Sequence, residues 1–255
     1  MKVEVISYTR DCEKLIAAAS KLTLSKKPFE EIWGSLSEDE IDTWIKETVI
    51  RWHFSPWEHC VYTFYISGVS RVLTHQLVRH RIASYSQHSQ RFKALHDIEF
   101  VVPDRINMSE EAKRLFLDTV DNAKDAYRKL IEKGIPFEDA RYVLPQAVTT
   151  KILVTMNARE LMHFFSLRMC TRAQLEIRRL AWLMWRKVYE LHPRLWKWAG
   201  PRCLQTENLI RRNPIEFPRV LEEAGVEFVS EKCPEGLPRE SIVKCLRHSY
   251  HEVSK

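Results

Sequence analysis

The spacing of hydrophobic residues changes along the chain between the two-residue period of strands and the three-to-four-residue period of helices. Residues 2–8 alternate as a short strand, and residues 60–66 combine valine, threonine and aromatic side chains at the density of a strand. We expect Gly68 to break this second strand. Residues 149–155 predict a buried strand, and residues 98–102 predict a further short one.

Helical spacing covers much of the remaining chain. Ser37 and Glu40 have the spacing of a capping box, and the helix that they open ends just before His53. A long amphipathic pattern ends at Gly134, a residue type that commonly terminates helices. The predicted helices span residues 11–22, 37–50, 69–78, 109–133, 158–169 and 172–191.

The length and composition set limits on organisation and compartment. The 255 residues contain no linker rich in Pro, Gly or Ser, so one domain is expected. The amino terminus lacks the hydrophobic region of a signal peptide, and no apolar run approaches the roughly 20 residues that span a bilayer. We therefore expect a soluble, cytoplasmic protein without a membrane partner.

The charge and the glycine content restrict the kind of ligand. Forty Lys and Arg residues against thirty-four Asp and Glu give a net charge of +6, which suits anionic small molecules or nucleic acid. Only six glycines are present, and neither GxGxxG nor GxxxxGK[ST] occurs. Any bound nucleotide must therefore be held mainly by side chains.

The six cysteines are scattered without CxxC pairs, which argues against a disulfide framework or a zinc ribbon. Cys245, His248 and His251 suggest a metal site at first sight. Three ligands within seven residues of one helix would not converge easily on one ion, so we expect a solvated C-terminal helix and no metal site.

Residues 79–91 form the most unusual segment of the chain. They contain three arginines, two histidines, three serines and two glutamines, with no lysine and no carboxylate. Guanidinium groups and hydroxyls together bind phosphate oxygens well, so the segment predicts an anion site at a helix end and in the loop that follows. A solvated basic patch that touches a nucleic-acid backbone is the alternative, although such patches are usually rich in lysine.

These residues and four further blocks resemble the flavin-dependent thymidylate synthases. The family's signature is similar to Arg79-His80-Arg81-x-x-Ser84 followed by Ser89-x-Arg91, and its later blocks lie in the same order. The other matching blocks are His53-x-Ser55-Pro56-Trp57-Glu58-His59, Ala140 to Pro145, Asn157 to Arg168 and Ala173 to Ile177.

The resemblance implies an α+β fold with a central, mostly antiparallel sheet flanked by long helices. It implies conversion of dUMP to dTMP, with methylenetetrahydrofolate as one-carbon donor, NADPH as reductant and FAD as the hydride carrier. The family's members are homotetramers with active sites shared between subunits. The chain would then comprise a catalytic domain at residues 1–198 and a C-terminal extension of unknown role at residues 199–255.

The resemblance also assigns residues to ligands position by position, and Arg79 and Gln87 are assigned to both ligands. The implied dUMP-binding residues are Gln76, Arg79, Gln87, His88, Ser89, Gln90, Arg91, Arg141 and Arg168. The implied FAD-binding residues are Ser55, Arg79, His80, Arg81, Gln87, Asn157, Ala158, Arg159 and His163. Some family members carry glutamate in place of Gln87, so proton transfer at that position is in doubt.

Two residues carry implied catalytic roles, His53 near the flavin and Arg168 beside the uracil ring. The unrelated class of thymidylate synthase activates uracil with a cysteine that lies between proline and histidine, and none of the six cysteines here has that setting. Activation would instead be electrostatic, by a cation placed where negative charge develops on the ring, and the family gives this role to the arginine that matches Arg168.

Two alternatives from other classes stay open at this point. One is a basic nucleic-acid-binding module, which the charge favours, although the aromatic residues lie in helical stripes and not between basic residues. The other is a flavoprotein without catalytic activity.

Overall fold

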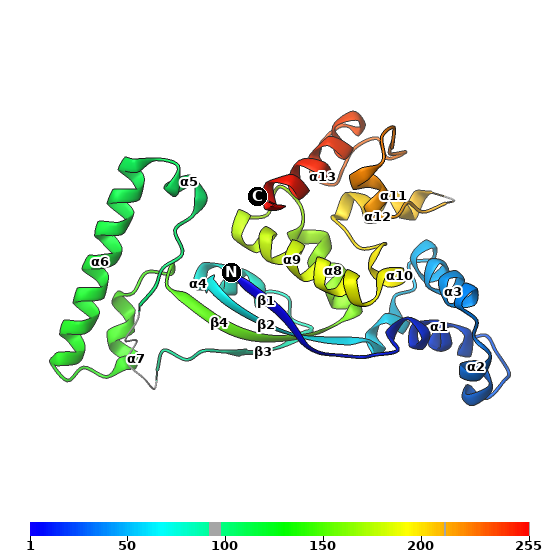
Figure 1. Cartoon of the computed structure of the whole chain (residues 1–255), viewed down its shortest axis with the longest axis horizontal. Helices are drawn as coiled ribbons and strands as arrows, with labels where there is room; N and C mark the ends of the chain where they lie inside the picture. The colour runs from blue at the N-terminus through cyan, green and yellow to red at the C-terminus, as the bar shows by residue number, and fades with distance from the viewer. Residues whose placement is uncertain (92–97, 212, 255) are drawn as a thin grey trace. The chain divides into compact units, whose positions relative to one another are not determined.

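The computed structural model describes residues 1–91, 98–211 and 213–254. Its four strands form an antiparallel sheet in the order β1-β2-β4-β3, and helices make up most of the remainder, so the predicted α+β class is confirmed. The strands are β1 (Lys2–Tyr8), β2 (Val61–Ser70), β3 (Ala83–Gln87) and β4 (Thr149–Asn157) (Figure 1).

The chain divides into two compact units, and β2 and β4 each run through both of them. The first unit comprises Met1–Lys2 and Tyr65–Val154, and the second comprises Val3–Phe64 and Thr155–Lys255. Within the described ranges, no helix combines the length and the apolar character needed to cross a membrane.

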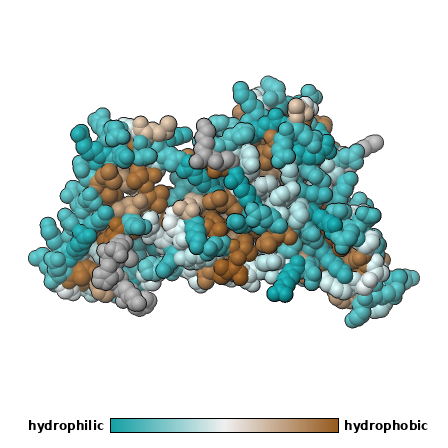
Figure 2. Space-filling model, viewed as in Figure 1, coloured by the Kyte–Doolittle hydropathy of each residue, from teal (hydrophilic) through white to brown (hydrophobic). Residues whose placement is uncertain are grey.

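The first unit is built on the sheet strands and one long helix. Its further elements are α4 (Arg71–Leu77), α5 (Asp104–Asn107), α6 (Glu110–Glu132), α7 (Phe137–Ala140) and the 3₁₀ helix η2 (Arg141–Val143). Ser109 caps α6 by accepting a hydrogen bond from the Ala112 amide. The helix is amphipathic, and Figure 2 shows its hydrophobic residues gathered along one side. A small core of Ile98, Tyr127, Ala140 and Val148 holds the unit together.

The second unit contains most of the helices. They are α1 (Cys12–Leu22), α2 (Phe29–Ser35), α3 (Glu38–Ile50), η1 (Ser55–His59), α8 (Ala158–Arg168), α9 (Leu175–Leu191), α10 (Pro193–Trp196), α11 (Arg202–Ile210), α12 (Phe217–Glu222) and α13 (Arg239–Ser254). Trp196 lies at the centre of an aromatic core, with its ring 5.4 Å from Phe165 and 5.6 Å from Tyr62. Its indole also donates a 3.0 Å hydrogen bond to the Tyr62 hydroxyl.

We call residues 199–255 the C-terminal segment. Two of its helices pack against the preceding ones of the same unit, α11 against α8 and α13 against α9. Phe217 stacks on Trp182 with ring centroids 5.4 Å apart. Gly200 allows Phe217 and Leu204 to pack close to the backbone, because a Cβ atom at this position would lie only 2.7 Å from the Leu204 side chain and 3.1 Å from the Phe217 ring. The C-terminal segment is therefore largely helical and part of the packed core. The expected C-terminal helix is present as α13, but it is not simply solvated, because Ile242, Leu246 and Ser249 are buried.

Several sequence predictions are wrong in detail. Gly68 does not break β2, because glycine accommodates its φ of 67° while the strand continues to Ser70. Residues 98–102 form only an isolated bridge between Phe100 and Val148. Strand β4 alternates between buried and more exposed residues and is not buried on both faces. The helix predicted from residue 172 begins at Leu175.

Candidate active site

The polar segment of residues 79–91 is not a continuous loop, because its middle forms β3. Within the described residues β3 pairs only with β4, so it is an edge strand, and polar side chains are tolerated there. The Tyr85 hydroxyl lies 2.9 Å from the Leu77 carbonyl oxygen and 2.6 Å from that of His80, which fixes the strand to the end of α4. The His88 amide donates to the Lys151 carbonyl of β4 at 2.9 Å. The middle of the segment is therefore an edge strand that hydrogen bonds hold to α4 and β4.

Gln87 lies at the end of β3 with its side-chain amide fixed by two hydroxyl groups. Its Nε2 atom donates to Thr74 Oγ1 at 3.1 Å and to Thr150 Oγ1 at 3.3 Å. The Thr74 hydroxyl itself donates to the Arg71 carbonyl oxygen at 3.1 Å. Both amide hydrogens of Gln87 are thus used within the protein, which leaves its carbonyl oxygen as the group that can meet a ligand.

Arg91 and Arg141 are brought together by one residue, Glu138. The Arg91 guanidinium forms an ion pair with the Glu138 carboxylate, and Arg141 Nε donates to the Glu138 backbone carbonyl oxygen at 3.0 Å. Arg91 and Glu138 also line a cavity of about 550 Å³ beside the turn that follows α6. The structure therefore brings together two of the arginines that the resemblance assigned to dUMP binding.

Arg71 is a further basic residue of this cluster that the sequence did not single out. Burial lowers the pKa of the half-buried Arg71 guanidinium, and the positive charge of Arg141 lowers it further. Arginine stays charged at neutral pH despite such shifts, so the two cations repel each other and favour an anion between them. Arg71 lies in a different segment from Arg141, and no spacing rule could connect them from the sequence.

The remaining predicted residues of the first unit differ in exposure. The side chains of Arg79, Arg81, His88 and Ser89 are exposed, and that of Gln76 is half-buried on α4. His80 and Gln90 are buried, with exposed fractions of 3% and 6%. Exposed guanidinium groups can meet a ligand directly, whereas His80 and Gln90 are placed to support the segment from inside.

In the second unit, a tight connection between α3 and η1 holds His53 and Ser55. Trp52 has a φ of 57°, the left-handed conformation that commonly ends a helix, and the His53 amide donates to the Thr48 carbonyl oxygen at 2.8 Å. The buried indole of Trp57 donates to the Thr48 hydroxyl at 2.8 Å, which fixes η1 to the same turn of α3. Both His53 and Ser55 are exposed on this braced connection.

Helix α8 presents two of the predicted FAD-binding residues on one exposed face. Arg159 and His163 are four residues apart, so they lie one turn apart on the helix, and both side chains are exposed. Arg159 forms an ion pair with Glu58 of η1. An exposed pair of this kind contributes only about 0–1 kcal/mol, so Arg159 can exchange Glu58 for another anion at little cost.

Two other predicted FAD-binding residues have structural partners at the start of α8. The Asn157 side-chain oxygen caps the helix by accepting from the Glu160 amide at 2.8 Å, so only its NH₂ group could reach a ligand. Ala158 is fully buried, and its amide donates to the Cys60 carbonyl oxygen at 2.7 Å. Their contact with FAD stays a prediction.

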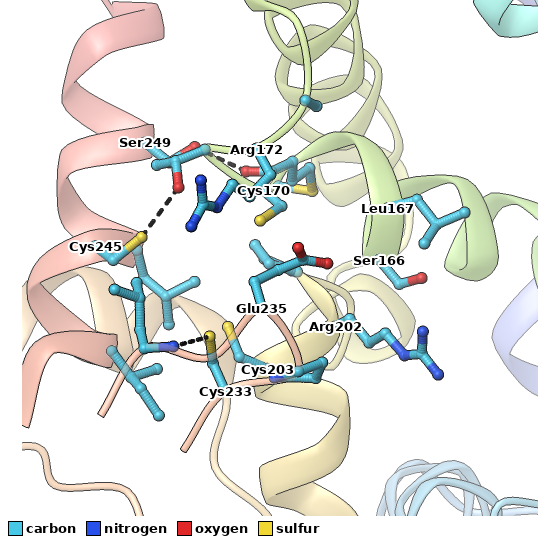
Figure 3. A pocket seen from close by; sticks show the side chains of 18 of the residues that line it. Ser166, Leu167, Cys170, Arg172, Arg202, Cys203, Cys233, Glu235, Cys245 and Ser249 are labelled. Carbon is cyan, nitrogen blue, oxygen red and sulfur yellow. Dashed lines mark hydrogen bonds between the residues drawn. The ribbon is translucent and has the colours of Figure 1, made fainter. Parts of the chain in front are cut away.

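Arg168 is the last residue of α8, and burial lowers the pKa of its half-buried guanidinium. A partly desolvated cation interacts more strongly with nearby negative charge than a fully hydrated one does. The residue also lines a cavity of about 230 Å³ that α8, the following turn and the C-terminal segment enclose (Figure 3). The electrostatic role that the resemblance implies for Arg168 stays a prediction.

Comparison with known proteins decides the family. A family model described as "Thymidylate synthase complementing protein" matches residues 4–194. A flavin-dependent thymidylate synthase of Sulfurisphaera tokodaii is 46% identical over 251 residues, which cover 98% of each chain. This chain belongs to the flavin-dependent thymidylate synthase family. A relative from Geobacter sulfurreducens with the same description is 45% identical over 80% of this chain and 89% of its own.

One solved structure has the same fold as this member of the flavin-dependent thymidylate synthase family. It is a UMP/dUMP methylase, PolB from Streptomyces cacaoi, bound with 5-Br dUMP. The TM-score is 0.69 at 24% identity, over 76% of this chain and 92% of that chain. Membership of an enzyme family favours the catalytic interpretation over the nucleic-acid-binding and noncatalytic alternatives.

The residues present suit the flavin that the family name implies. Arg159, His163 and Ser55 offer exposed guanidinium, imidazole and hydroxyl donors in the second unit. The pyrophosphate of FAD is anionic and its isoalloxazine ring carries hydrogen-bond acceptors, so these donors match it chemically. All of these donors are side chains, in agreement with the low glycine content, which argues against a glycine-rich phosphate-binding loop.

Proposed function

We propose that the protein converts dUMP to dTMP, with methylenetetrahydrofolate as one-carbon donor and NADPH as reductant. The observation that carries the proposal is the binding of both Arg91 and Arg141 to Glu138, with Arg71 near enough to Arg141 to be affected by its charge. These residues bring together three guanidinium groups and one carboxylate, an excess of positive charge that suits the phosphate of a nucleotide. Bound FAD would accept hydride from NADPH and deliver it to the one-carbon unit.

Gln87 and Arg168 would act on the uracil ring. The Gln87 carbonyl oxygen can accept a hydrogen bond from the ring N3–H group, because both hydrogens of its amide are held by threonines. Arg168 would stabilise the negative charge that develops on the ring as carbon 5 becomes nucleophilic. His53 would lie near the flavin and the entrance of folate or nicotinamide.

The state of the cysteines supports activation without a covalent nucleophile. Burial raises the pKa of both the Cys170 and the Cys203 thiols, and hydrogen bonding to Cys12 together with burial raises that of Cys60. A nucleophilic cysteine needs the opposite shift, because the thiolate is the reactive form. All six thiols are free, which fits the reducing conditions of the cytoplasm that we propose as the compartment.

Flavin binding and product formation test the proposal at two levels. The purified protein should be yellow, or become so when FAD is added, with flavin absorbance that survives gel filtration. Under anaerobic conditions, dUMP, methylenetetrahydrofolate and NADPH together should yield dTMP. Reactions that lack one of the three co-reactants provide the controls, and UMP in place of dUMP tests selectivity for the deoxyribose. Flavin binding without dTMP would leave a noncatalytic flavoprotein.

We also propose the homotetramer with shared active sites that the family resemblance implies. Sedimentation analysis should then give a mass close to four times the 30.3 kDa of one chain. Mixing two impaired variants, one altered at Arg141 and the other at Arg168, should restore part of the activity if different protomers supply these residues to one site. No restoration after subunit exchange would contradict shared sites that divide these two residues.

A further inference from the structure

The backbone that follows Arg168 depends on contacts from outside the matched family region. Arg168 ends α8, and residues 169–174 form a turn before α9 begins at Leu175. The direction of a side chain at a helix end depends on how the last carbonyl groups of that helix are held, because they lack partners within the helix. Whatever fixes the 169–174 turn therefore also fixes the end of the helix from which the Arg168 side chain extends.

Helix α13 of the C-terminal segment binds this turn at two points. The Ser249 hydroxyl donates to the Met169 carbonyl oxygen at 2.7 Å and accepts a hydrogen bond from the Trp182 indole at 3.2 Å. One turn earlier on α13, Cys245 Sγ lies 3.2 Å from the hydroxyl of Thr171. Ser249 is 1% exposed, so its hydrogen bonds are shielded from water. Figure 3 shows Cys245 and Ser249 facing the turn that carries Cys170 and Arg172.

A third contact holds the same turn through α9. Arg178 is buried, and its NH1 atom donates to the Thr171 carbonyl oxygen at 2.9 Å. Its NH2 atom binds the carboxylate of Glu252 on α13. The carbonyl groups of Met169 and Thr171 are thus both bound by groups that α13 supplies or holds in place.

The family model ends at residue 194, so α13 lies outside the region that defines the family. We propose that the C-terminal segment positions Arg168 for the reaction, with Ser249 as the principal positioning residue and Cys245 as its neighbour. This inference rests on the role proposed for Arg168. Ser249 touches no substrate; it fixes the peptide that follows the reacting arginine.

The experiment compares Ser249→Ala with Lys244→Ala, which alters an exposed residue of the same helix. Ser249→Ala should lower kcat/KM for dUMP by about tenfold, the effect of one or two lost hydrogen bonds on a transition-state contact. Flavin absorbance and the KM for NADPH should stay at the wild-type values. Lys244→Ala should behave as the wild type in every measurement, and equal activity of the two variants would overturn the inference.

A double-variant test separates positioning from general destabilisation. If Ser249 acts through Arg168, then Ser249→Ala alone should weaken dUMP binding, and adding it to Arg168→Ala should not weaken binding any further, as measured by calorimetry. A further loss of affinity of the same size as in the single variant would show that Ser249 acts independently of Arg168. That result would overturn the inference while leaving the role of Arg168 intact.

Cys245 supplies a second test in case Ser249→Ala folds poorly. Cys245→Ser keeps a partner for the Thr171 hydroxyl and should keep activity, whereas Cys245→Ala should lower kcat/KM for dUMP about threefold, since a thiol bond is weak. Equal activity of these two variants would contradict the proposal. Full activity of Arg168→Ala would instead remove the proposed catalytic role, and the positioning inference with it.

Discussion

The guanidinium groups of Arg91 and Arg141 are held by the two ends of one residue, the carboxylate and the backbone carbonyl oxygen of Glu138. The two bonds differ in how easily a ligand can replace them. The ion pair of Arg91 is exposed and therefore weak, whereas the contact of Arg141 is with a neutral carbonyl oxygen, which orients the guanidinium without neutralising its charge. A phosphate can therefore take the place of the carboxylate while Arg141 keeps its orientation.

Arg141→Ala should weaken dUMP binding by about 10- to 150-fold, the loss expected for a charge-assisted hydrogen bond of about 1.5–3 kcal/mol. Calorimetry with dUMP and with deoxyuridine, which lacks the phosphate, measures the effect. The affinity for deoxyuridine should be nearly unchanged. Arg128→Ala is the matched control, because Arg128 is an exposed arginine of the same unit that pairs with Asp125. Equal losses for dUMP and deoxyuridine would contradict phosphate binding by Arg141.

Gln87 combines a ligand contact with a stabilising role in the sheet. Gln87→Leu leaves the hydroxyls of Thr74 and Thr150 without their donor and should reduce the free energy of unfolding by about 1–3 kcal/mol. Gln87→Glu should cost less, since both hydroxyls can turn to donate, although Thr74 then gives up its bond to the Arg71 carbonyl. Urea unfolding should show the wild type as the most stable protein, Gln87→Glu as the next and Gln87→Leu as the least stable. The prediction is contradicted if Gln87→Glu is the least stable of the three.

Local sequence patterns predicted the helices well because their determinants are close in sequence. The capping box of Ser37 and Glu40 opens α3 as expected, and Gly134 follows the end of α6 with a φ of 80°. Strand β3 was missed because its residues are polar. An edge strand needs only one hydrogen-bonded neighbour and no continuous hydrophobic run, so its composition resembles that of a loop.

The candidate site shows the same difference between residues that local sequence motifs could predict and contacts between distant segments that they could not. The family blocks named Arg91 and Arg141, but Arg71 joined these two only through the effect of the Arg141 charge on it in the folded chain. The contacts of Ser249 with Met169 also link distant segments, and no pattern in the C-terminal segment announced them. Long-range pairs of this kind depend on how helices and strands pack, which the spacing of residues within one element does not contain.

Arg159→Ala should lower the affinity for FAD by about tenfold through the loss of one charge-assisted contact with the pyrophosphate. Fluorescence titration of the flavin-free protein with FAD measures the change. Glu58→Gln removes the competing carboxylate and should leave FAD affinity unchanged or higher. Arg51→Ala serves as control, because this exposed arginine pairs with Glu47 on α3. Weaker FAD binding in Glu58→Gln would show that the carboxylate assists the flavin site.

Arg168→Ala should remove measurable turnover, a fall in kcat of at least about 100- to 1000-fold, because it deletes the cation that stabilises the developing charge. Flavin absorbance should remain, since Arg168 is not among the proposed FAD contacts. Arg168→Lys should recover a part of the lost rate, because it restores the charge without the planar fork of donors. Anaerobic single-turnover assays for dTMP distinguish the three proteins, and retained turnover in Arg168→Ala would refute the role.

The C-terminal segment should lose stability in acid because of Glu207 on α11. Its carboxylate is fully buried and accepts from the Val229 amide at 2.6 Å and from the Ser230 hydroxyl at 2.6 Å, and it pairs with Arg211. Burial tends to raise the pKa of Glu207, but the bonds from Ser230, Val229 and Arg211 outweigh it and lower the pKa below the ordinary 4.5. The folded protein therefore binds this proton less tightly than the unfolded chain does.

A lowered pKa in the folded state fixes the direction of the effect. The stabilisation is complete above about pH 4.5 and is lost as the pH falls through the lower pKa of the folded protein. Glu207→Gln should reduce stability at neutral pH by about 1–3 kcal/mol, because an amide NH₂ then meets hydrogen-bond donors, and should also flatten the dependence on pH. Urea unfolding from pH 3 to pH 7 measures both effects. Glu223→Gln is the control, because the exposed ion pair of Glu223 with Arg219 contributes little to stability. If the free energy of unfolding depends equally on pH in the wild type and in Glu207→Gln, the role assigned to Glu207 is wrong.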